Sequence, residues 1–277
     1  MEHRASRLIL ASLAVLLLTQ CRSPAPDRSS GGRPPVLLAI FAHPDDEASV
    51  GPVLAKYASA GVRVYLAVAT DGRLGANEHA GIPAGDSLAA ARAGELQCAA
   101  EKLGLQAPII FGLHDQLKMA EGLESYGQQI SELRDRVKKL FDELQPDAVI
   151  TWPSSGWTGH PDHRMVSAVV TEVFQSKRWE QPAQLYYPAV PTGRLPESHP
   201  LSAAAMDPRF LSVEISVSPQ DYEKAKRAWL CHQSQYTPEQ IEQLHQSLVS
   251  TQKGAAHFQP MTPATGKATS LLPGSKR

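Results

Sequence analysis

The 277-residue sequence carries no excess charge of either sign, because 27 Lys and Arg residues stand against 28 Asp and Glu residues and give a formal net charge of -1. A chain without a strong field does not attract nucleic acid over a distance, and no basic run with interleaved aromatic residues compensates. The sequence also lacks the G-x-G-x-x-G and G-x-x-x-x-G-K-[ST] patterns that hold dinucleotides and nucleotide phosphates. Nucleic acid is therefore not an expected partner, and these absences argue against nucleotide cofactors bound in those loops.

Cysteine is scarce, with three residues in the whole chain. Cys98 and Cys231 fall in segments that we expect to be helical, and sequence alone does not distinguish a disulfide pair from two buried thiols. We expect both to be free and buried, as small apolar side chains commonly are.

The third cysteine, Cys21, belongs to an N-terminal segment typical of an export signal. A short basic start is followed by an apolar run over 8–18, which is too short to span a bilayer comfortably. The sequence "LTQC" ending at Cys21 resembles a bacterial lipoprotein signal, so residues 1–21 are expected to be a signal peptide whose cysteine is lipidated. Gln20 stands where a small residue is usual, which leaves plain secretion or an uncleaved anchor open. We expect an exported, membrane-anchored lipoprotein in the periplasm or at the cell surface.

The rest of the chain divides into a linker, one domain and a tail. Residues 22–35 are rich in Pro, Ser and Gly and are expected to form a flexible linker, so the membrane is contacted only through the anchor. Residues 36–253 are long enough for one large core, and short β-rich runs alternate there with segments of helical period. Residues 254–277 lack periodicity and are expected to be a mobile tail.

This alternation of strands and helices predicts an α/β fold. Because strand and helix repeat in turn, we expect a three-layer Rossmann-like arrangement with a mostly parallel sheet covered by helices on both sides. The expected strands are 36–41, 62–69, 108–111, 148–152 and 184–187. The expected helices are 46–60, 86–103, 123–144 and 163–175.

Chemistry-bearing residues follow the first expected strand, where seven apolar residues run directly into "HPDDE". Ligands in such folds bind at the carboxyl ends of parallel strands, and the carboxylates of Asp45, Asp46 and Glu47 would repel a phosphate. His43 and Asp46 are three residues apart and offer an imidazole nitrogen and a carboxylate oxygen. These ligands suit Zn²⁺, with Fe²⁺ or Co²⁺ as alternatives. Asp45 should face another way and is free to act as a base for an attacking water.

A second cluster, "TWPSSGWTGHPDHR", follows the expected strand 148–152 and opens on the same edge of the sheet. His160, Asp162 and His163 all begin the next helix, and this cluster supplies a candidate third ligand. Trp152 and Trp157 flank it and could stack on a sugar face, although Trp152 ends a strand and is more simply a core residue. Other histidines show no ligand spacing and are interpreted as surface or hydrogen-bonded polar residues: His79, His114, His199, His245 and His257.

The two clusters together resemble the zinc-dependent de-N-acetylases of the PIG-L/LmbE type, which remove acetyl groups from N-acetylglucosamine-containing conjugates. The resemblance runs over 36–236 and includes "AHPDDE", "TDGRLG" at 70–75, "RAGEL" at 92–96, "HPDH" at 160–163 and "HQSQ" at 232–235. Arg73 stands where an acidic residue is common, and "GLHD" at 112–115 replaces a more usual Gly-Leu-Pro-Asp. Both departures concern substrate detail.

The resemblance implies a zinc site with ligands His43, Asp46 and His163. It also implies that Asp45 is the general base, while the zinc lowers the pKa of a water and polarises the acetamide carbonyl.

The resemblance further implies that His160, as an imidazolium, stabilises the tetrahedral oxyanion and protonates the leaving amine. Asp162 would orient or charge this imidazole. Arg92 would reach a hydroxyl or phosphate of the substrate, unless it pairs with Glu95 on its own helix. His232 would lie at the rim of the active site, unless it is a structural or capping histidine.

The expected function is therefore a metal-dependent hydrolase that releases acetate and a free amine from an N-acetylglucosamine-type conjugate, a small molecule or a glycan. One alternative is a metal-dependent hydrolase of another amide, since the ligands do not specify the group that carries the amide. Another is a non-catalytic carbohydrate-binding lipoprotein of the cell surface. The intact Asp45 and His160 argue against that second alternative, because a pure binder has no use for a base beside the metal.

Overall fold

A computed structural model describes residues 33–195, 199, 204–263 and 266–274, which all belong to one compact unit. The expected signal peptide and most of the linker, residues 1–32, lie outside the described residues. Within the described ranges, none of the helices combines the length and the apolarity that a membrane span requires.

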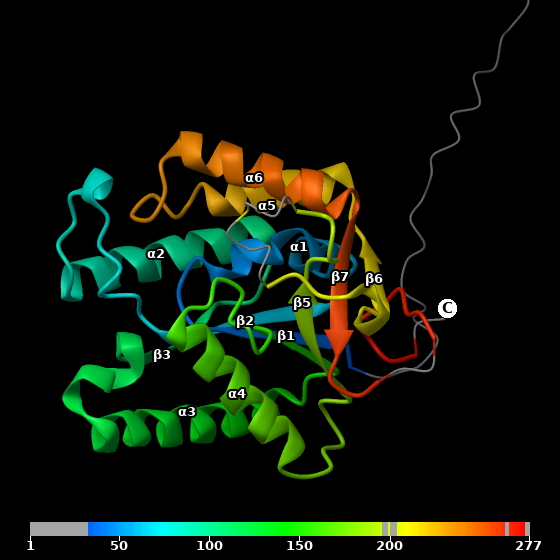
Figure 1. Ribbon diagram of the computed structural model, residues 1–277, viewed down its shortest axis with the longest axis horizontal. Coiled ribbons are helices and arrows are strands. Elements are labelled where there is room, and N and C mark those ends of the chain that lie inside the picture. Colours follow the sequence, from blue (N-terminus) through cyan, green and yellow to red (C-terminus); the bar gives the residue numbers. More distant parts are fainter. Residues whose placement is uncertain (1–32, 196–198, 200–203, 264–265, 275–277) are drawn as a thin grey trace, which may run out of the picture. The chain divides into compact units, whose positions relative to one another are not determined.

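A seven-stranded sheet forms the centre of the fold, in the order β3-β2-β1-β4-β5-β7-β6 (Figure 1). Neighbouring strands from β3 to β5 pair in parallel, whereas β7 is antiparallel to both β5 and β6. Its strands are β1 (Val36–Phe41), β2 (Arg63–Thr70), β3 (Ile109–Leu113), β4 (Ala148–Thr151), β5 (Gln184–Ala189), β6 (Val213–Ser216) and β7 (Ala255–Pro260). The predicted α/β fold with a mostly parallel sheet is confirmed.

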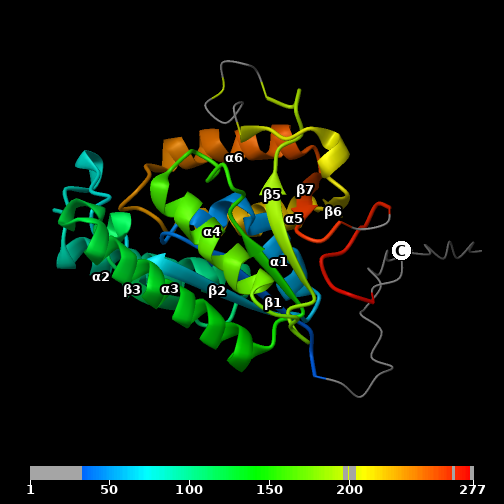
Figure 2. The same cartoon turned by 60° about the horizontal axis from the view of Figure 1, so that its bottom comes forward.

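Helices cover both faces of this sheet (Figure 1). α1, α2 and α5 lie on one face, with α6 packed outside α5, and α3 and α4 lie on the other, as the turned view of Figure 2 also shows. The helices are α1 (Gly51–Ser59), α2 (Asp86–Leu103), α3 (Leu123–Leu144), α4 (Pro161–Gln175), α5 (Pro219–Trp229) and α6 (Pro238–Gln252).

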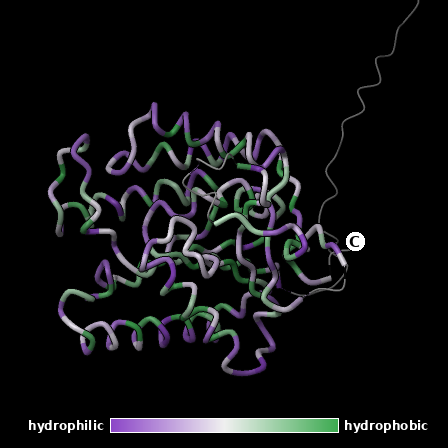
Figure 3. The backbone as a smooth tube through the Cα atoms, viewed as in Figure 1, coloured by the Kyte–Doolittle hydropathy of each residue, from purple (hydrophilic) through white to green (hydrophobic). Residues whose placement is uncertain are grey.

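The alternation of side chains along β1 explains why both faces need a cover. Leu37 and Ala39 join the core under α1, α2 and α5, while Leu38 and Ile40 join the core under α3 and α4. All six residues of β1 are apolar and buried, as expected of a strand that is covered on both faces (Figure 3).

Most of the predicted boundaries hold. α2 and α3 match the predicted ranges, and α4 begins two residues before the predicted 163, with His160 as its N-cap and Pro161 at its first position. The predicted helix 46–60 is divided into a 3-10 turn at Asp46–Ser49 and then α1.

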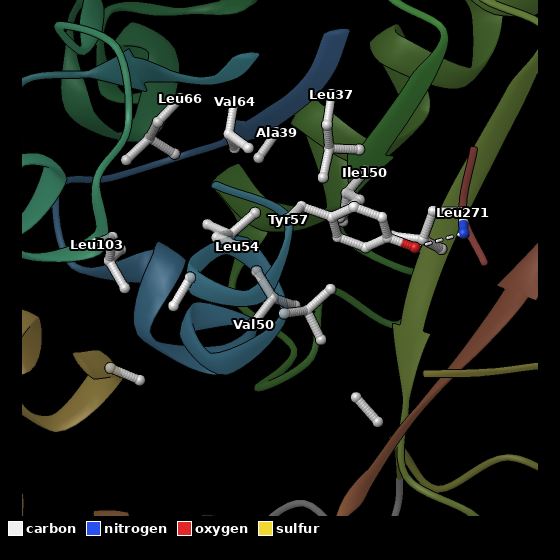
Figure 4. Close-up of a cluster of buried hydrophobic side chains, with 14 of the residues drawn as sticks. Leu37, Ala39, Val50, Leu54, Tyr57, Val64, Leu66, Leu103, Ile150 and Leu271 are labelled. Atoms are coloured by element: carbon white, nitrogen blue, oxygen red, sulfur yellow. Dashed lines mark hydrogen bonds between the residues drawn. The ribbon is translucent and has the colours of Figure 1, made fainter. Parts of the chain in front are cut away.

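The prediction of a mobile tail from residue 254 was wrong. Residues Ala255–Pro260 form β7 between β5 and β6, and Leu271 is fully buried in the main core. The backbone N–H of Leu271 donates a hydrogen bond of 2.7 Å to the hydroxyl of Tyr57 on α1 (Figure 4). The polar, proline-rich composition concealed this because the segment is held by pairing and packing with distant residues, which local sequence does not encode.

The prediction of two free thiols was also wrong, because Cys98 on α2 and Cys231 form a disulfide. The two residues are 133 positions apart in sequence, and their Cα atoms lie 5.9 Å apart in the fold. Only the packing of α5 against α2 brings them together.

Candidate active site

The two predicted clusters meet at one edge of the sheet. β1 and β4 are neighbours and run in parallel, with Ile40 opposite Thr151, so the residues that follow each strand emerge side by side. The connections from β1 lead to β2 and β3 on one side, and those from β4 lead to β5 on the other, which makes this the switch point of the sheet. A cavity of about 660 Å³ opens there. Its lining includes His43, Asp45, Asp46, His160, Asp162 and His163.

Asp46 is held by three N–H donors that all bind the same oxygen. Its Oδ2 accepts hydrogen bonds from the backbone of Ala42 and of His43, each 2.9 Å, and from Nε1 of Trp152 at 3.1 Å. Its other oxygen, Oδ1, lies 3.2 Å from Nε2 of His163. Burial would raise the pKa of Asp46, but the neighbouring His163 and His43 hold it well below its usual range. The carboxylate is thus ionised, and Oδ1 is the oxygen that faces His163.

His43 and His163 are each anchored through one ring nitrogen. Nε2 of His43 lies 3.1 Å from Oδ2 of Asp162, and Nδ1 of His163 lies 3.0 Å from the carbonyl oxygen of Gly156. Both partners only accept hydrogen bonds, so these two nitrogens carry protons. The opposite nitrogens, Nδ1 of His43 and Nε2 of His163, face each other at 3.2 Å. Such an arrangement, with the far N–H of each imidazole tied to an acceptor, is the usual support of metal-ligating histidines.

The spacing of these atoms fits a metal ion. Nδ1 of His43 lies 3.2 Å from Nε2 of His163, which lies 3.2 Å from Oδ1 of Asp46. Nδ1 of His43 lies 3.7 Å from the other carboxylate oxygen of Asp46, Oδ2. A tetrahedral zinc ion with bonds of about 2.0–2.1 Å has ligands about 3.3 Å apart. An overlapping group of three histidines, His43, His160 and His163, also offers nitrogens within 4.8 Å of one another.

Asp45 occupies the position between the two ligand candidates and has an unusual backbone. Its φ is 114°, a left-handed conformation that residues other than glycine rarely adopt. Its carboxylate accepts hydrogen bonds from Arg92 at 3.1 Å and from the hydroxyl of Tyr236 at 3.2 Å. Burial raises the pKa of Asp45, an effect that Arg92 opposes.

Arg92 lines the cavity, so its predicted contact with the substrate stays a prediction. It is 4% exposed, and its guanidinium donates to the carbonyl oxygens of Gly72 and Pro44 and to Asp45. Within the part of the chain that the structure describes it does not bond Glu95, and its two terminal nitrogens, Nη1 and Nη2, donate to the protein. Arg92 therefore holds the residues around Asp45.

The "TDGRLG" loop is shaped around this arginine. A Cβ at Gly72 would lie 2.5 Å from the guanidinium carbon of Arg92, and a Cβ at Gly75 would lie 2.6 Å from its Nη1. Asp115, which sequence reasoning had not singled out, accepts from the backbone of Gly72 at 3.0 Å and of Leu74 at 2.7 Å. The two glycines are thus needed for close approach, and the aspartate of "GLHD" fixes the loop.

His232 does not lie at the rim of the cavity. It is fully buried, and its Nε2 lies 2.6 Å from Oε1 of Glu47, which is 1% exposed. The second oxygen of Glu47 accepts the backbone N–H of Asp45 at 3.1 Å. Nearby, Glu95 accepts from both the backbone and the hydroxyl of Ser234. The prediction that His232 binds substrate was wrong, because His232 bonds Glu47, which in turn bonds the backbone of Asp45.

His160 and Asp162 also differ from expectation. The carboxylate of Asp162 binds His43 and the backbone N–H of Gln116, at 2.8 Å, and not the ring of His160. The backbone N–H of Asp162 donates instead to Nδ1 of His160 at 3.2 Å. Burial and the nearby His43 lower the pKa of His160. His160 is therefore a neutral imidazole near neutral pH, with its other nitrogen, Nε2, available as a donor.

Aromatic side chains line the ligand cluster. Trp152 is 2% exposed and stacks on His163 with ring centroids 4.7 Å apart, in addition to its bond with Asp46. Trp157, Tyr236 and His199 line the cavity. His199 was interpreted as a surface or merely hydrogen-bonded residue, and Tyr236 was not singled out. Tyr236 directly follows the "HQSQ" motif, and this position was the one sign in the sequence that it could belong to the site.

The fold and the site together define an α/β protein with a group of metal-ligand candidates at the switch point of its sheet. The family model for GlcNAc-PI de-N-acetylases, PIG-L, matches residues 38–174. A 1D-myo-inositol 2-acetamido-2-deoxy-alpha-D-glucopyranoside deacetylase 2 of Catenulispora acidiphila is 30% identical over 208 residues, which cover 67% of each chain. The chain belongs to the PIG-L family.

Further relatives support this grouping. A deacetylase of the same inositol glycoside from Mycobacteroides abscessus is 31% identical over 173 residues, covering 57% of this chain and 62% of that relative. The chain thus spans less than two thirds of the length of this relative.

Solved structures at lower identity share the fold. An N,N'-diacetylchitobiose deacetylase from Pyrococcus horikoshii superposes with a TM-score of 0.59 at 20% identity, covering 82% of this chain and 83% of that chain. A 4-carboxy-2-hydroxymuconate hydratase from Pseudomonas putida superposes with a TM-score of 0.60 at 15% identity, covering 85% of this chain and all of the other.

Proposed function

We propose that the protein is a metal-dependent N-deacetylase that hydrolyses the acetamide of an N-acetylglucosamine-type conjugate to acetate and a free amine. The observation that carries this proposal is the pair of anchored histidines, whose free nitrogens and Asp46 Oδ1 converge at the edge of a cavity that also holds Asp45. Membership of the PIG-L family and the relatives named as deacetylases of a 2-acetamido-2-deoxyglucose derivative support the same chemistry.

The proposed metal ligands are His43, Asp46 and His163, and the proposed ion is Zn²⁺, with Fe²⁺ or Co²⁺ as alternatives. This set is favoured over the three histidines because it includes the ionised carboxylate of Asp46, whose Oδ1 lies 3.2 Å from Nε2 of His163. An ion bound there supplies a water of lowered pKa and polarises the amide carbonyl. Asp162 and Gly156 hold the rings of His43 and His163 in the tautomers that ligation requires.

Asp45 and His160 supply the proton transfers. The carboxylate of Asp45 accepts the proton of the attacking water, and its raised pKa keeps it basic enough for this role. Nε2 of His160 donates a hydrogen bond to the oxyanion that develops on the former carbonyl oxygen. The departing amine takes up the proton that Asp45 received, which restores the carboxylate.

The size and lining of the cavity suit a sugar conjugate. At about 660 Å³ it lies within the range of about 300–1,000 Å³ that small-molecule sites occupy. The ring of Trp157 on its wall can stack on the apolar face of a pyranose.

Two other functions compete with this proposal. The first is hydrolysis of a different amide, and the second is carbohydrate binding without turnover. Asp45 favours a reaction over binding alone, because a left-handed backbone and a buried carboxylate are costly features for a pure binding site.

The deciding experiment incubates the metal-loaded protein with N-acetylated sugars, their glycosides and simple acetamides, and measures acetate and free amine. Release from N-acetylglucosamine conjugates but not from simple acetamides supports the proposal. Release from the simple acetamides alone supports the first alternative. Binding of the sugars without any acetate supports the second, and Asp45→Asn serves as the inactive control.

We further propose that the protein is exported and anchored as a lipoprotein through Cys21. The basic start, the apolar run 8–18 and Cys21 support this proposal. The disulfide between Cys98 and Cys231 is in keeping with it, because disulfides persist in oxidising compartments outside the cytoplasm.

A further inference from the structure

The main chain at Asp45 is held in its strained conformation by a buried side chain. At a φ of 114° the backbone N–H of Asp45 donates to Oε2 of Glu47 at 3.1 Å. A non-glycine residue persists in such a conformation only when its surroundings impose it. Glu47 is therefore a direct restraint on the direction in which the Asp45 side chain leaves the backbone.

Glu47 is itself fixed by His232. The carboxylate of Glu47 is 1% exposed and has no access to bulk water, so its position depends on its hydrogen-bond donors. One oxygen receives Asp45 N–H, and the other lies 2.6 Å from Nε2 of His232, whose side chain is fully buried. The imidazole and the backbone of Asp45 are thus joined through a single carboxylate.

His232 is part of a short segment, 231–236, in which every residue contacts an element of the site region. The contacts are Cys231 with Cys98, His232 with Glu47, the carbonyl of Gln233 with His79, Ser234 with Glu95, Gln235 with Asn77 and Gly75, and Tyr236 with Asp45. The segment therefore binds α2, the loop after β2 and the turn after β1 together. Asp45 receives restraints from it at both the backbone and the carboxylate.

We infer that His232 and Glu47 are positioning residues that hold the backbone of Asp45, and hence its carboxylate, in the orientation needed for proton transfer. This inference rests on the proposed role of Asp45 as the general base. His232 does not line the cavity, so it acts through Glu47 and not on the substrate. Loss of the restraint should therefore lower kcat while leaving KM and the metal content unchanged.

The test compares three variants of the full chain. His232→Leu removes the donor to Glu47, whereas His232→Gln retains an N–H donor in its place. His245→Leu is the matched control, because His245 is also buried but bonds the carbonyl oxygen of Tyr222 on α5, away from Asp45. Each variant is measured for metal content, kcat and KM, and the crystal structure of each is determined.

We expect His232→Leu to lose roughly 10–100-fold in kcat, the scale of a misplaced catalytic group, with KM and metal content within twofold of the wild type. His232→Gln should recover most of this loss, and His245→Leu should keep the wild-type kcat. An unchanged kcat in His232→Leu, or an equal loss in the His245→Leu control, would overturn the inference.

The crystal structures separate this inference from the proposed reaction. If the wild-type protein releases no acetate from any amide, the proposed function fails, but the conformation of Asp45 still decides the positioning. Asp45 should leave the left-handed region in His232→Leu and keep it in His232→Gln and His245→Leu. A φ near the wild-type 114° in His232→Leu would contradict the restraint.

Discussion

Nδ1 of His43 and Nε2 of His163 lie 3.2 Å apart although the two residues are separated by 120 positions in sequence. Their opposite nitrogens are tied to Asp162 and Gly156, so both rings present a ligand atom to the same point. Two nitrogens that face each other at this distance need a shared cation between or beside them, either a proton or a metal ion.

The first prediction is that the purified protein binds about one divalent ion per chain, as a single set of three protein ligands implies. The double variant His43→Ala/His163→Ala should bind none, because it leaves Asp46 as the sole ligand of the proposed set. Elemental analysis after dialysis measures both. His257→Ala on β7 is the control and should retain the ion, and retention of the ion by the double variant would rule out the ligand assignment.

A second prediction follows from the proton that His43 holds when no ion is bound. Burial lowers the pKa of His43, but its bonds to Asp162 and Asp46 outweigh this and raise the pKa to about 10. A bound ion must therefore displace this proton. At about pH 6, below the range where a water on zinc ionises, binding should release about one proton, and the number should fall as pH rises through the pKa of His43.

Calorimetry in two buffers of different ionisation enthalpy measures the released proton. No release at about pH 6 would mean that His43 is already neutral, and that its bond with Asp162 does not have the strength assigned to it.

The roles of the adjacent aspartates give a third prediction. Asp45→Asn should keep the ion but lose roughly 10²–10⁴ in turnover, the range for removal of a general base. Asp46→Asn should weaken metal binding, since an amide lacks the charge that faces His163. Metal content and turnover are measured together in both variants. An equal loss of metal in the two would require Asp45 to be reassigned as a ligand.

The sequence predicted those elements whose signals are local. β1 to β5 follow from apolar, β-branched runs, and His43, Asp46, His160 and His163 share an edge because each cluster directly follows a parallel strand. To predict that these four residues lie together, it is enough to know that the two strands they follow are neighbours in the sheet.

The partners of Arg92, Asp162 and His232 could not be read in the same way. Sequence offered Arg92 the carboxylate of Glu95, three residues further on, but its guanidinium bonds Gly72 and Pro44, which lie 20 and 48 positions away. His232 reaches Glu47 across 185 positions. These contacts depend on how α2 and α5 pack on the sheet, and a hydrogen-bonding side chain carries no sequence mark of its distant partner. β7 was missed for the same reason, since its neighbours β5 and β6 lie far from it in the chain.

The disulfide supports a fourth prediction, on stability. Cys98→Ser/Cys231→Ser should lower the free energy of unfolding by about 2–4 kcal/mol, because the cross-link closes a long loop in the unfolded chain. Thermal unfolding with and without reductant measures the change, and a thiol titration under denaturing conditions confirms the pairing. A melting temperature that is the same in reduced and oxidised protein would show that the cross-link contributes nothing to stability.

The fifth prediction concerns the place of the protein in the cell and rests on Cys21. In a bacterial host the mature protein should fractionate with membranes, because a diacylated N-terminus supplies two chains of anchoring. Deletion of the residues before Val36 should release a soluble protein. Arg22 follows the cysteine where an Asp would usually retain a lipoprotein at the inner membrane, so an envelope with two membranes should carry the protein at the outer one.

Cys21→Ser distinguishes the alternatives: loss of lipid, of signal cleavage and of normal sorting together indicates a lipoprotein. A Cys21→Ser protein that is still cleaved and is secreted freely would instead identify plain secretion. One whose size and membrane association match the wild type would identify an uncleaved N-terminal helix, and the unusual Gln20 would then explain why the signal is not processed.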